Sequence, residues 1–330
     1  MRKETCYCHG LLFVFLGVFV GCSMGQAPYS GSVLTRTIGA PASQDYYGFS
    51  VSSSGGYVAV GAPQCSLTYL ATSTVPTGHF TGDGSPNDGY VDIFQCSDAT
   101  GLCTYVAQVW PGNYPEPDNR GSCFGFSVAL VISSAVSLLV VGMPAEGDYN
   151  NGDFSGGFLL FNMANPASPE YVDYINADTD SASYAMGWSV AVSVVSASSI
   201  FIFSGMPFYE GGYGAIGGEW CTSVTNCNFN KDNIMTDFSG SYFSDNPTVC
   251  SGTSGDCKYM GLSLATAQGY PVVAVGGGYW SANDPPNIAL LACSTSSVTC
   301  TPTFTPFNPP LTSSGTHLFL QDPSALKFLI

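Results

Sequence analysis

The sequence predicts an all-β protein, a β-propeller of four-stranded antiparallel blades, and three observations lead to this prediction. Only 9% of the 330 residues are charged, whereas 39 residues are glycine and 13% are aromatic. This composition favours strands and turns over solvated helices. A short glycine-centred sequence recurs four times along the chain, and a second apolar strand that ends in glycine follows each copy. Each copy therefore predicts a β-hairpin.

The charge balance restricts the class of partner. Seven Lys and Arg residues stand against 23 Asp and Glu residues, which gives a formal net charge of −16. A chain with so few basic residues cannot neutralise a phosphate backbone, so we expect no nucleic-acid partner. Because 45% of the residues are hydrophobic, the chain is also expected to fold rather than to stay disordered.

The first 25 residues have the layout of a secretory signal peptide. Arg2 and Lys3 precede the apolar run 11–20, and small residues follow it. We therefore predict a signal peptide at 1–25 and a secreted, extracellular or cell-surface protein. Membrane association is expected only if the signal stays uncleaved or the chain continues to an anchor.

Removal of this signal leaves ten cysteines, an even number that suits an oxidising compartment. Zinc is the alternative, but the mature chain has no C-x2-C pair and only two histidines. We predict disulfides between cysteines six or seven positions apart, with the last two cysteines paired by elimination. The predicted pairs are Cys96 and Cys103, Cys221 and Cys227, Cys250 and Cys257, Cys293 and Cys300, and Cys65 and Cys123.

The repeats set the predicted domain, a propeller over 26–330. The four glycine-centred copies occupy 47–51, 124–128, 186–190 and 260–264. The second strands are expected at 58–63, 139–144, 203–207 and 272–276, and third strands at 89–94, 157–161 and 288–291. Fourth strands at 105–109 and 171–175 complete the pattern. Blades are thus predicted to start near 47, 124, 186 and 260, with a partial fifth blade near 315.

These elements resemble the FG-GAP repeats of the integrin α-chain N-terminal β-propeller. The resemblance lies in 124–129, 60–63 and 89–94. It implies seven blades, whereas this chain holds about four and a partial fifth, so the chain is either a fragment or closes in another way. Family members often carry a calcium loop between the first two strands of a blade. Here those connections contain no carboxylate, so no cofactor or metal is expected.

Two uncharged stretches allow a competing interpretation as membrane helices. They span 126–143 and 186–208 and are long enough to cross a bilayer. Both have serine pairs near the centre, lack flanking Lys or Arg, and align with the shorter hairpin at 48–63. We therefore predict hairpins here too.

Function is expected on the face formed by the connections between strands two and three and between strand four and the next blade. The resemblance implies that these connections lie together, and in this chain the first kind is long: 64–88, 145–156, 208–217 and 279–286. Long loops on a rigid scaffold usually carry binding residues. The predicted contacts with an extracellular protein or glycan are Tyr149, Phe154, Phe208, Tyr209, Tyr279 and Trp280. The alternative is that these side chains fold inward and cap their own loops.

Catalytic signatures are nearly absent. No nucleophile elbow, H-E-x-x-H or Walker sequence occurs, and the glycine-rich stretch 212–217 is predicted to be a flexible loop. We therefore expect an adhesion-like binding protein without catalysis. A secreted hydrolase, or the non-catalytic propeller module of one, is the alternative, because paired carboxylates that meet only in the fold leave no sequence motif.

Overall fold

The structure is a computed structural model, and it describes residues 46–63, 89–97, 101–111, 122–146, 155–176, 184–209, 214–228, 234–237, 259–277, 288–294 and 300–304. All strands lie in one compact unit, Leu34–Ile330. The predicted signal peptide and the predicted fifth blade near 315 fall outside the described residues.

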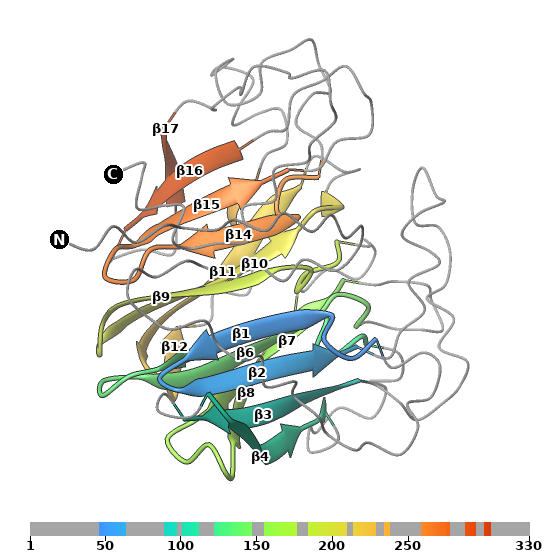
Figure 1. The fold of residues 1–330 in the computed structure, drawn as a ribbon. Coiled ribbons are helices and arrows are strands. Elements are labelled where there is room, and N and C mark those ends of the chain that lie inside the picture. Colours follow the sequence, from blue (N-terminus) through green and yellow to red (C-terminus); the bar gives the residue numbers. More distant parts are fainter. Residues whose placement is uncertain are drawn as a thin grey trace, which may run out of the picture. The chain divides into compact units, whose positions relative to one another are not determined.

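The described elements are β-strands in four antiparallel sheets, each in simple sequence order (Figure 1). The first sheet contains β1 (Ser50–Ser54), β2 (Tyr57–Ala62), β3 (Tyr90–Cys96) and β4 (Cys103–Val109). The second contains β5 (Ser127–Ile132), β6 (Ser137–Met143), β7 (Gly157–Asn162) and β8 (Glu170–Asn176). The third contains β9 (Val190–Ser196), β10 (Ser199–Met206), β11 (Ala215–Ser223) and β12 (Asn226–Asn228), and β13 (Ile234–Asp237) also pairs with β11. The fourth contains β14 (Ser263–Thr266), β15 (Val272–Gly276), β16 (Ile288–Cys293) and β17 (Cys300–Phe304).

The sequence prediction of an all-β protein with four repeated hairpins is therefore confirmed. In three sheets the repeat serine pairs with the glycine that ends or nearly ends the second strand, as Ser50 does with Gly61. In the third sheet Ser189 precedes β9, and its carbonyl accepts a hydrogen bond from the Gly205 N–H. Repeat glycines such as Gly48 precede the strand and form a turn instead. The predicted loop at 212–217 is partly wrong, because β11 begins at Ala215. Gly217 and the next residue, Gly218, lie in β11, and a Cβ atom at Gly218 would collide with the Ile202 carbonyl.

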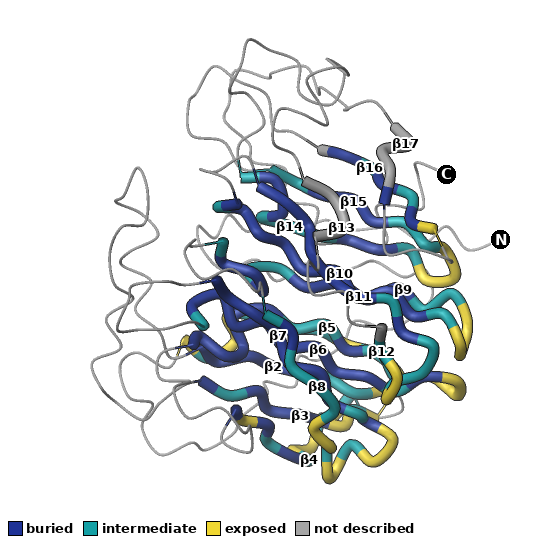
Figure 2. The backbone as a smooth tube through the Cα atoms, turned by 180° about the vertical axis from the view of Figure 1, so that it is seen from behind, coloured by how far each residue is buried: buried dark blue, intermediate teal, exposed yellow. Residues whose placement is uncertain are grey.

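Each uncharged stretch forms a hairpin whose second strand, β6 or β10, is buried on both faces. In β6, Leu138 and Val140 lie in a core with side chains of the third sheet, whereas Leu139 and Val141 lie in a core with side chains of the first. Such strands read as continuous apolar runs, which is why they match the length of a membrane span. Figure 2 shows the buried strands and, at their hairpin turns, the exposed residues. No helix with the length and apolarity of a membrane span occurs in the part of the chain that the structure describes.

Each sheet is joined to the next by the repeat serine. The hydroxyls of Ser50, Ser127 and Ser189 donate hydrogen bonds to the carbonyls of the next repeat glycines, Gly125, Gly187 and Gly261, over 2.8, 2.8 and 2.7 Å. The second-strand glycines Gly61, Gly142 and Gly205 lie against these same carbonyls and leave no room for a Cβ atom. The recurring serine and glycines therefore connect neighbouring sheets.

Serine side chains of one first strand also accept hydrogen bonds from backbone N–H groups at the edge of the next first strand. Ser52 and Ser54 of β1 accept hydrogen bonds from the backbone N–H groups of Leu130 and Ile132 in β5, over 3.0 and 2.9 Å. An unpaired strand edge would otherwise be free to pair with another chain. The first strands thus lie beside one another without merging into one sheet.

Disulfides close the outer hairpins of three sheets. Each joins residues that face one another in the β-ladder, at the turn between the third and fourth strands. They are Cys96–Cys103, Cys221–Cys227 and Cys293–Cys300, as predicted from the spacing. Cys123 is also disulfide-bonded, while Cys65, Cys250 and Cys257 lie outside the described residues. These bonds indicate an oxidising compartment.

The second sheet has no disulfide in this hairpin. Asn162 and Glu170 are the last facing pair of β7 and β8, and the Asn162 amide donates a 3.4 Å hydrogen bond to Glu170. We expect the double variant Asn162→Cys and Glu170→Cys to form a disulfide in this hairpin as well and to raise the free energy of unfolding by about 2 kcal/mol, by restricting the unfolded chain. Denaturant titration of the oxidised variant and of the unmodified chain checks this. No difference between the two proteins would contradict it.

Candidate functional site

The turns that precede the first strands share one unusual backbone geometry. The repeat glycines Gly48, Gly125, Gly187 and Gly261 have φ angles between 84° and 98°. The residue two positions before each glycine is also left-handed, although it carries a side chain: Tyr46, Cys123, Ala185 and Tyr259, with φ between 44° and 60°. Two left-handed residues per turn fix how the chain enters each first strand. The residue after each glycine therefore takes an equivalent position in every sheet.

Aromatic residues occupy this position in three sheets and form a continuous row. Its members are Phe49, Phe126, Trp188, Phe208 and Tyr259, and we call this set the aromatic row. Successive ring centroids are 4.7, 4.8, 5.3 and 5.6 Å apart. Such spacing is typical of interacting aromatic side chains. The fourth sheet has Leu262 at the equivalent position. Beyond Trp188 the row therefore continues through Phe208 to Tyr259, which lies in the turn before the fourth sheet.

Part of the aromatic row is open to solvent. Phe49 is 43% exposed, whereas Phe126 is buried. The ring of Phe126 contacts the rings of Phe49 and Trp188. Trp188 and Tyr259 are half-buried. The row lies where the first strands begin and the second strands end, which is the end from which the predicted binding loops leave. It thus presents a rigid apolar surface on a scaffold of hydrogen-bonded turns.

Two of the six predicted contact residues are described, and both pack within the chain. Phe208 belongs to the aromatic row and is half-buried between Trp188 and Tyr259. Tyr209 is buried, and its ring centroid lies 4.6 Å from that of Tyr184. The other predicted contacts, Tyr149, Phe154, Tyr279 and Trp280, lie outside the described residues.

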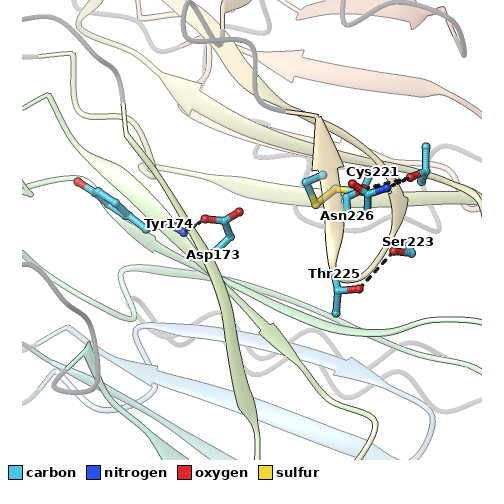
Figure 3. Close-up of a disulfide and its surroundings, with 8 residues drawn as sticks. Asp173, Tyr174, Cys221, Ser223, Thr225 and Asn226 are labelled. Atoms are coloured by element: carbon cyan, nitrogen blue, oxygen red, sulfur yellow. Dashed lines mark hydrogen bonds between the residues drawn. A yellow bond between two sulfur atoms is a disulfide. The ribbon is translucent and has the colours of Figure 1, made fainter.

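Two neighbouring carboxyl groups, the fully buried Glu219 and the half-buried Asp173, lie between the second and third sheets. Glu219 of β11 is fully buried, and neither of its carboxyl oxygens has a hydrogen-bond partner. Burial and, as the smaller cause, the charge of Asp173 on β8 together raise the pKa of Glu219 to about 8. Burial also raises the pKa of Asp173, although the N–H of Tyr174 donates a 2.8 Å hydrogen bond to this carboxylate (Figure 3). The sequence analysis missed this pair, because its members are distant in sequence and belong to different sheets.

One cluster has metal-ligand chemistry among the residues that the structure describes. An oxygen of Glu219 and the sulfurs of Cys221 and Cys227 lie within 4.8 Å of one another. The two sulfurs are joined in a disulfide, and a metal would need them as free thiolates. The cluster in its oxidised form is therefore unsuited to a metal ion.

Comparisons with known proteins find likeness among solved structures. No model of a protein family matches the chain, and no curated protein matches it. One of the solved structures is the crystal structure of a thermostable family-43 glycoside hydrolase, with a TM-score of 0.36 and 10% identity. The match covers 81% of this chain and 95% of that chain. This likeness assigns neither a fold nor an activity to the chain, and the resemblance to FG-GAP repeats stays a prediction.

The prediction of an adhesion-like protein without catalysis is corrected. The solved structure reported above is a glycoside hydrolase, which is the class of the alternative prediction. In the described part of the predicted loop face, Phe208 and Tyr209 make ring contacts with other residues of this chain. Their role as partner contacts stays a prediction.

Proposed function

We propose that this chain is the carbohydrate-holding propeller module of a secreted hydrolase, with the aromatic row as the surface on which the saccharide lies. The row is the observation that carries the proposal. Sugar rings present apolar C–H faces that stack on aromatic side chains, and ligand sites are commonly lined by aromatic residues on a preformed scaffold. Phe49 supplies an exposed ring, and Phe126 behind it keeps that ring in place.

The charge of the chain points to a neutral saccharide. The net charge of −16 creates a field that repels polyanions. The aromatic row contains no ionisable group other than the Tyr259 hydroxyl. A neutral oligosaccharide therefore fits the row better than an acidic polysaccharide does.

The sheet arrangement supports a propeller. Three four-stranded sheets and one sheet with an additional fifth strand follow one another, consecutive sheets bury apolar faces against each other, and the same serine-to-glycine hydrogen bond joins each to the next. Blades of a propeller pack in this way. The disulfides support secretion, because they persist in oxidising compartments.

The proposal predicts that Phe49→Ala weakens saccharide binding about tenfold, because the change removes an exposed ring without opening the core. Trp188→Ala is expected to weaken binding further, since tryptophan offers the largest face. Calorimetric titration of the chain with neutral hexasaccharides (β-1,4-glucan, β-1,4-mannan and α-1,4-glucan) measures both effects.

Tyr105→Ala is the matched control, because Tyr105 is 47% exposed on the outer strand β4 of the first sheet. Its affinity is expected to equal that of the unmodified chain. Equal affinities for Phe49→Ala and Tyr105→Ala would remove the aromatic row as the binding surface. Release of reducing ends from the same saccharides would make the chain itself the hydrolase rather than a module of one.

A further inference from the structure

The three disulfides of the outer hairpins occupy equivalent places, but their surroundings differ. Among the described residues, only Cys221–Cys227 has a carboxyl oxygen within 4.8 Å of both sulfurs, that of Glu219. This carboxyl is fully buried and makes no hydrogen bond. An unpaired polar group in a core is costly unless it serves another purpose.

The two sulfurs of this disulfide differ in access. Cys221 is 1% exposed and belongs to the apolar core between the second and third sheets. Cys227 is half-buried and follows the exposed turn residues Thr225 and Asn226 (Figure 3). Access decides which sulfur a thiolate attacks. An incoming thiolate therefore reaches Cys227, and Cys221 becomes the leaving group.

The leaving group is the difficult part of this reaction. Breaking the bond would leave a negative sulfur on Cys221 inside an apolar core, where an isolated charge is strongly disfavoured. A proton donor beside that sulfur removes the difficulty. At pH 7 the carboxyl of Glu219 still holds its proton, because burial and the charge of Asp173 raise its pKa to about 8.

We propose that Cys221–Cys227 is a thiol–disulfide exchange site in which Glu219 donates a proton to the departing Cys221 sulfur. The reductant is a dithiol. One thiolate of the dithiol bonds to the Cys227 sulfur while the Cys221–Cys227 bond breaks, and the electron pair of that bond passes to Cys221. The Glu219 proton moves to Cys221, and Glu219 regains a proton from solvent.

The second thiol of the dithiol completes the exchange. As its thiolate, it attacks the sulfur bound to Cys227, and Cys227 leaves and takes up a proton. The dithiol ends as a disulfide, and the two cysteines end as thiols. Two electrons have passed from the dithiol to the protein.

The experiment compares the disulfides within one sample. The full chain is treated with dithiothreitol at pH 7, free thiols are alkylated at intervals, and peptide mass spectrometry gives a reduction rate for each pair. Cys96–Cys103 is the control matched at the attacked sulfur, because both of its cysteines are half-buried, as Cys227 is. Reduction of Cys221–Cys227 is expected to be at least about tenfold faster than that of Cys96–Cys103, which is a modest effect for general acid catalysis.

Glu219→Gln keeps the size of the side chain but removes the proton. The rate at Cys221–Cys227 is expected to fall about tenfold, while the rates at Cys96–Cys103 and Cys293–Cys300 stay unchanged and report an intact fold. Equal rates at Cys221–Cys227 and Cys96–Cys103 in the unmodified chain would overturn the proposal without any variant. An unchanged rate at Cys221–Cys227 in a folded Glu219→Gln chain would overturn it as well.

Discussion

Replacing Glu219 with glutamine is expected to raise the free energy of unfolding by about 4 to 5 kcal/mol above pH 8 and to leave it nearly unchanged below pH 4.5. In the unfolded chain this carboxyl has its ordinary pKa of 4.5, whereas burial and the charge of Asp173 raise its pKa to about 8 in the folded chain. Each unit of difference is worth about 1.4 kcal/mol. The effect is large because the carboxyl is fully buried and makes no hydrogen bond.

The sign follows from where the proton is held. Between pH 4.5 and about 8 the folded chain keeps the Glu219 proton and the unfolded chain loses it. The contribution of this group to stability is therefore complete below pH 4.5 and is lost as the pH rises through 8. Glutamine does not titrate, so this loss disappears in the variant.

Denaturant titrations at intervals from pH 4 to pH 9 measure the effect. Glu170→Gln makes the same chemical change on an exposed side chain of β8, and its pH profile is expected to follow that of the unmodified chain. A Glu219→Gln profile parallel to that of the unmodified chain would show that the buried carboxyl is not the source of the pH dependence.

Gly205→Ala is expected to destabilise the fold by about 3 kcal/mol, because overpacking forces backbone to move. A Cβ at Gly205 would collide with the carbonyl of Gly261 and with the Ser189 hydroxyl. These two groups form the 2.7 Å hydrogen bond that joins the third sheet to the fourth. Neither can move without weakening that connection. Thermal unfolding followed by circular dichroism measures the change.

Gly276→Ala is the matched control in the fourth sheet. Gly276 occupies the equivalent place, but a Cβ there would collide only with the hydroxyl of Ser263, which can rotate away. We expect this variant to cost less than about 1 kcal/mol. Equal losses for the two variants would mean that the cost arises within each hairpin rather than between sheets.

Local pattern was enough to predict the hairpins. In all four sheets the repeated glycine and serine mark the start of the observed first strand. The apolar segment that follows each repeat corresponds to the observed second strand. The short cysteine spacings likewise predicted three observed disulfides. Each of these features depends on residues close together in the chain, since a two-stranded hairpin sets its own register.

The candidate sites could not be predicted in this way. Phe49, Phe126 and Trp188 come from three different sheets, and Glu219 meets Asp173 only because two sheets bury their faces together. Glu219 and Cys221, by contrast, lie two positions apart on the same face of β11. The repeats did place an aromatic residue after three of the glycines. That signal would have found most of the aromatic row if the equivalent positions had been compared across repeats.

The sequence by itself determined the all-β class, the four hairpins and the short disulfide loops, because alternation, turn glycines and cysteine spacing act over a few residues. Only the tertiary structure decided that the recurring serines bind the carbonyls of the next repeat, that the aromatic rings form one row, and that the Glu219 carboxyl is buried without a hydrogen-bond partner. The serine contacts join residues 60 to 75 positions apart, where the packing of one sheet on another sets the distances.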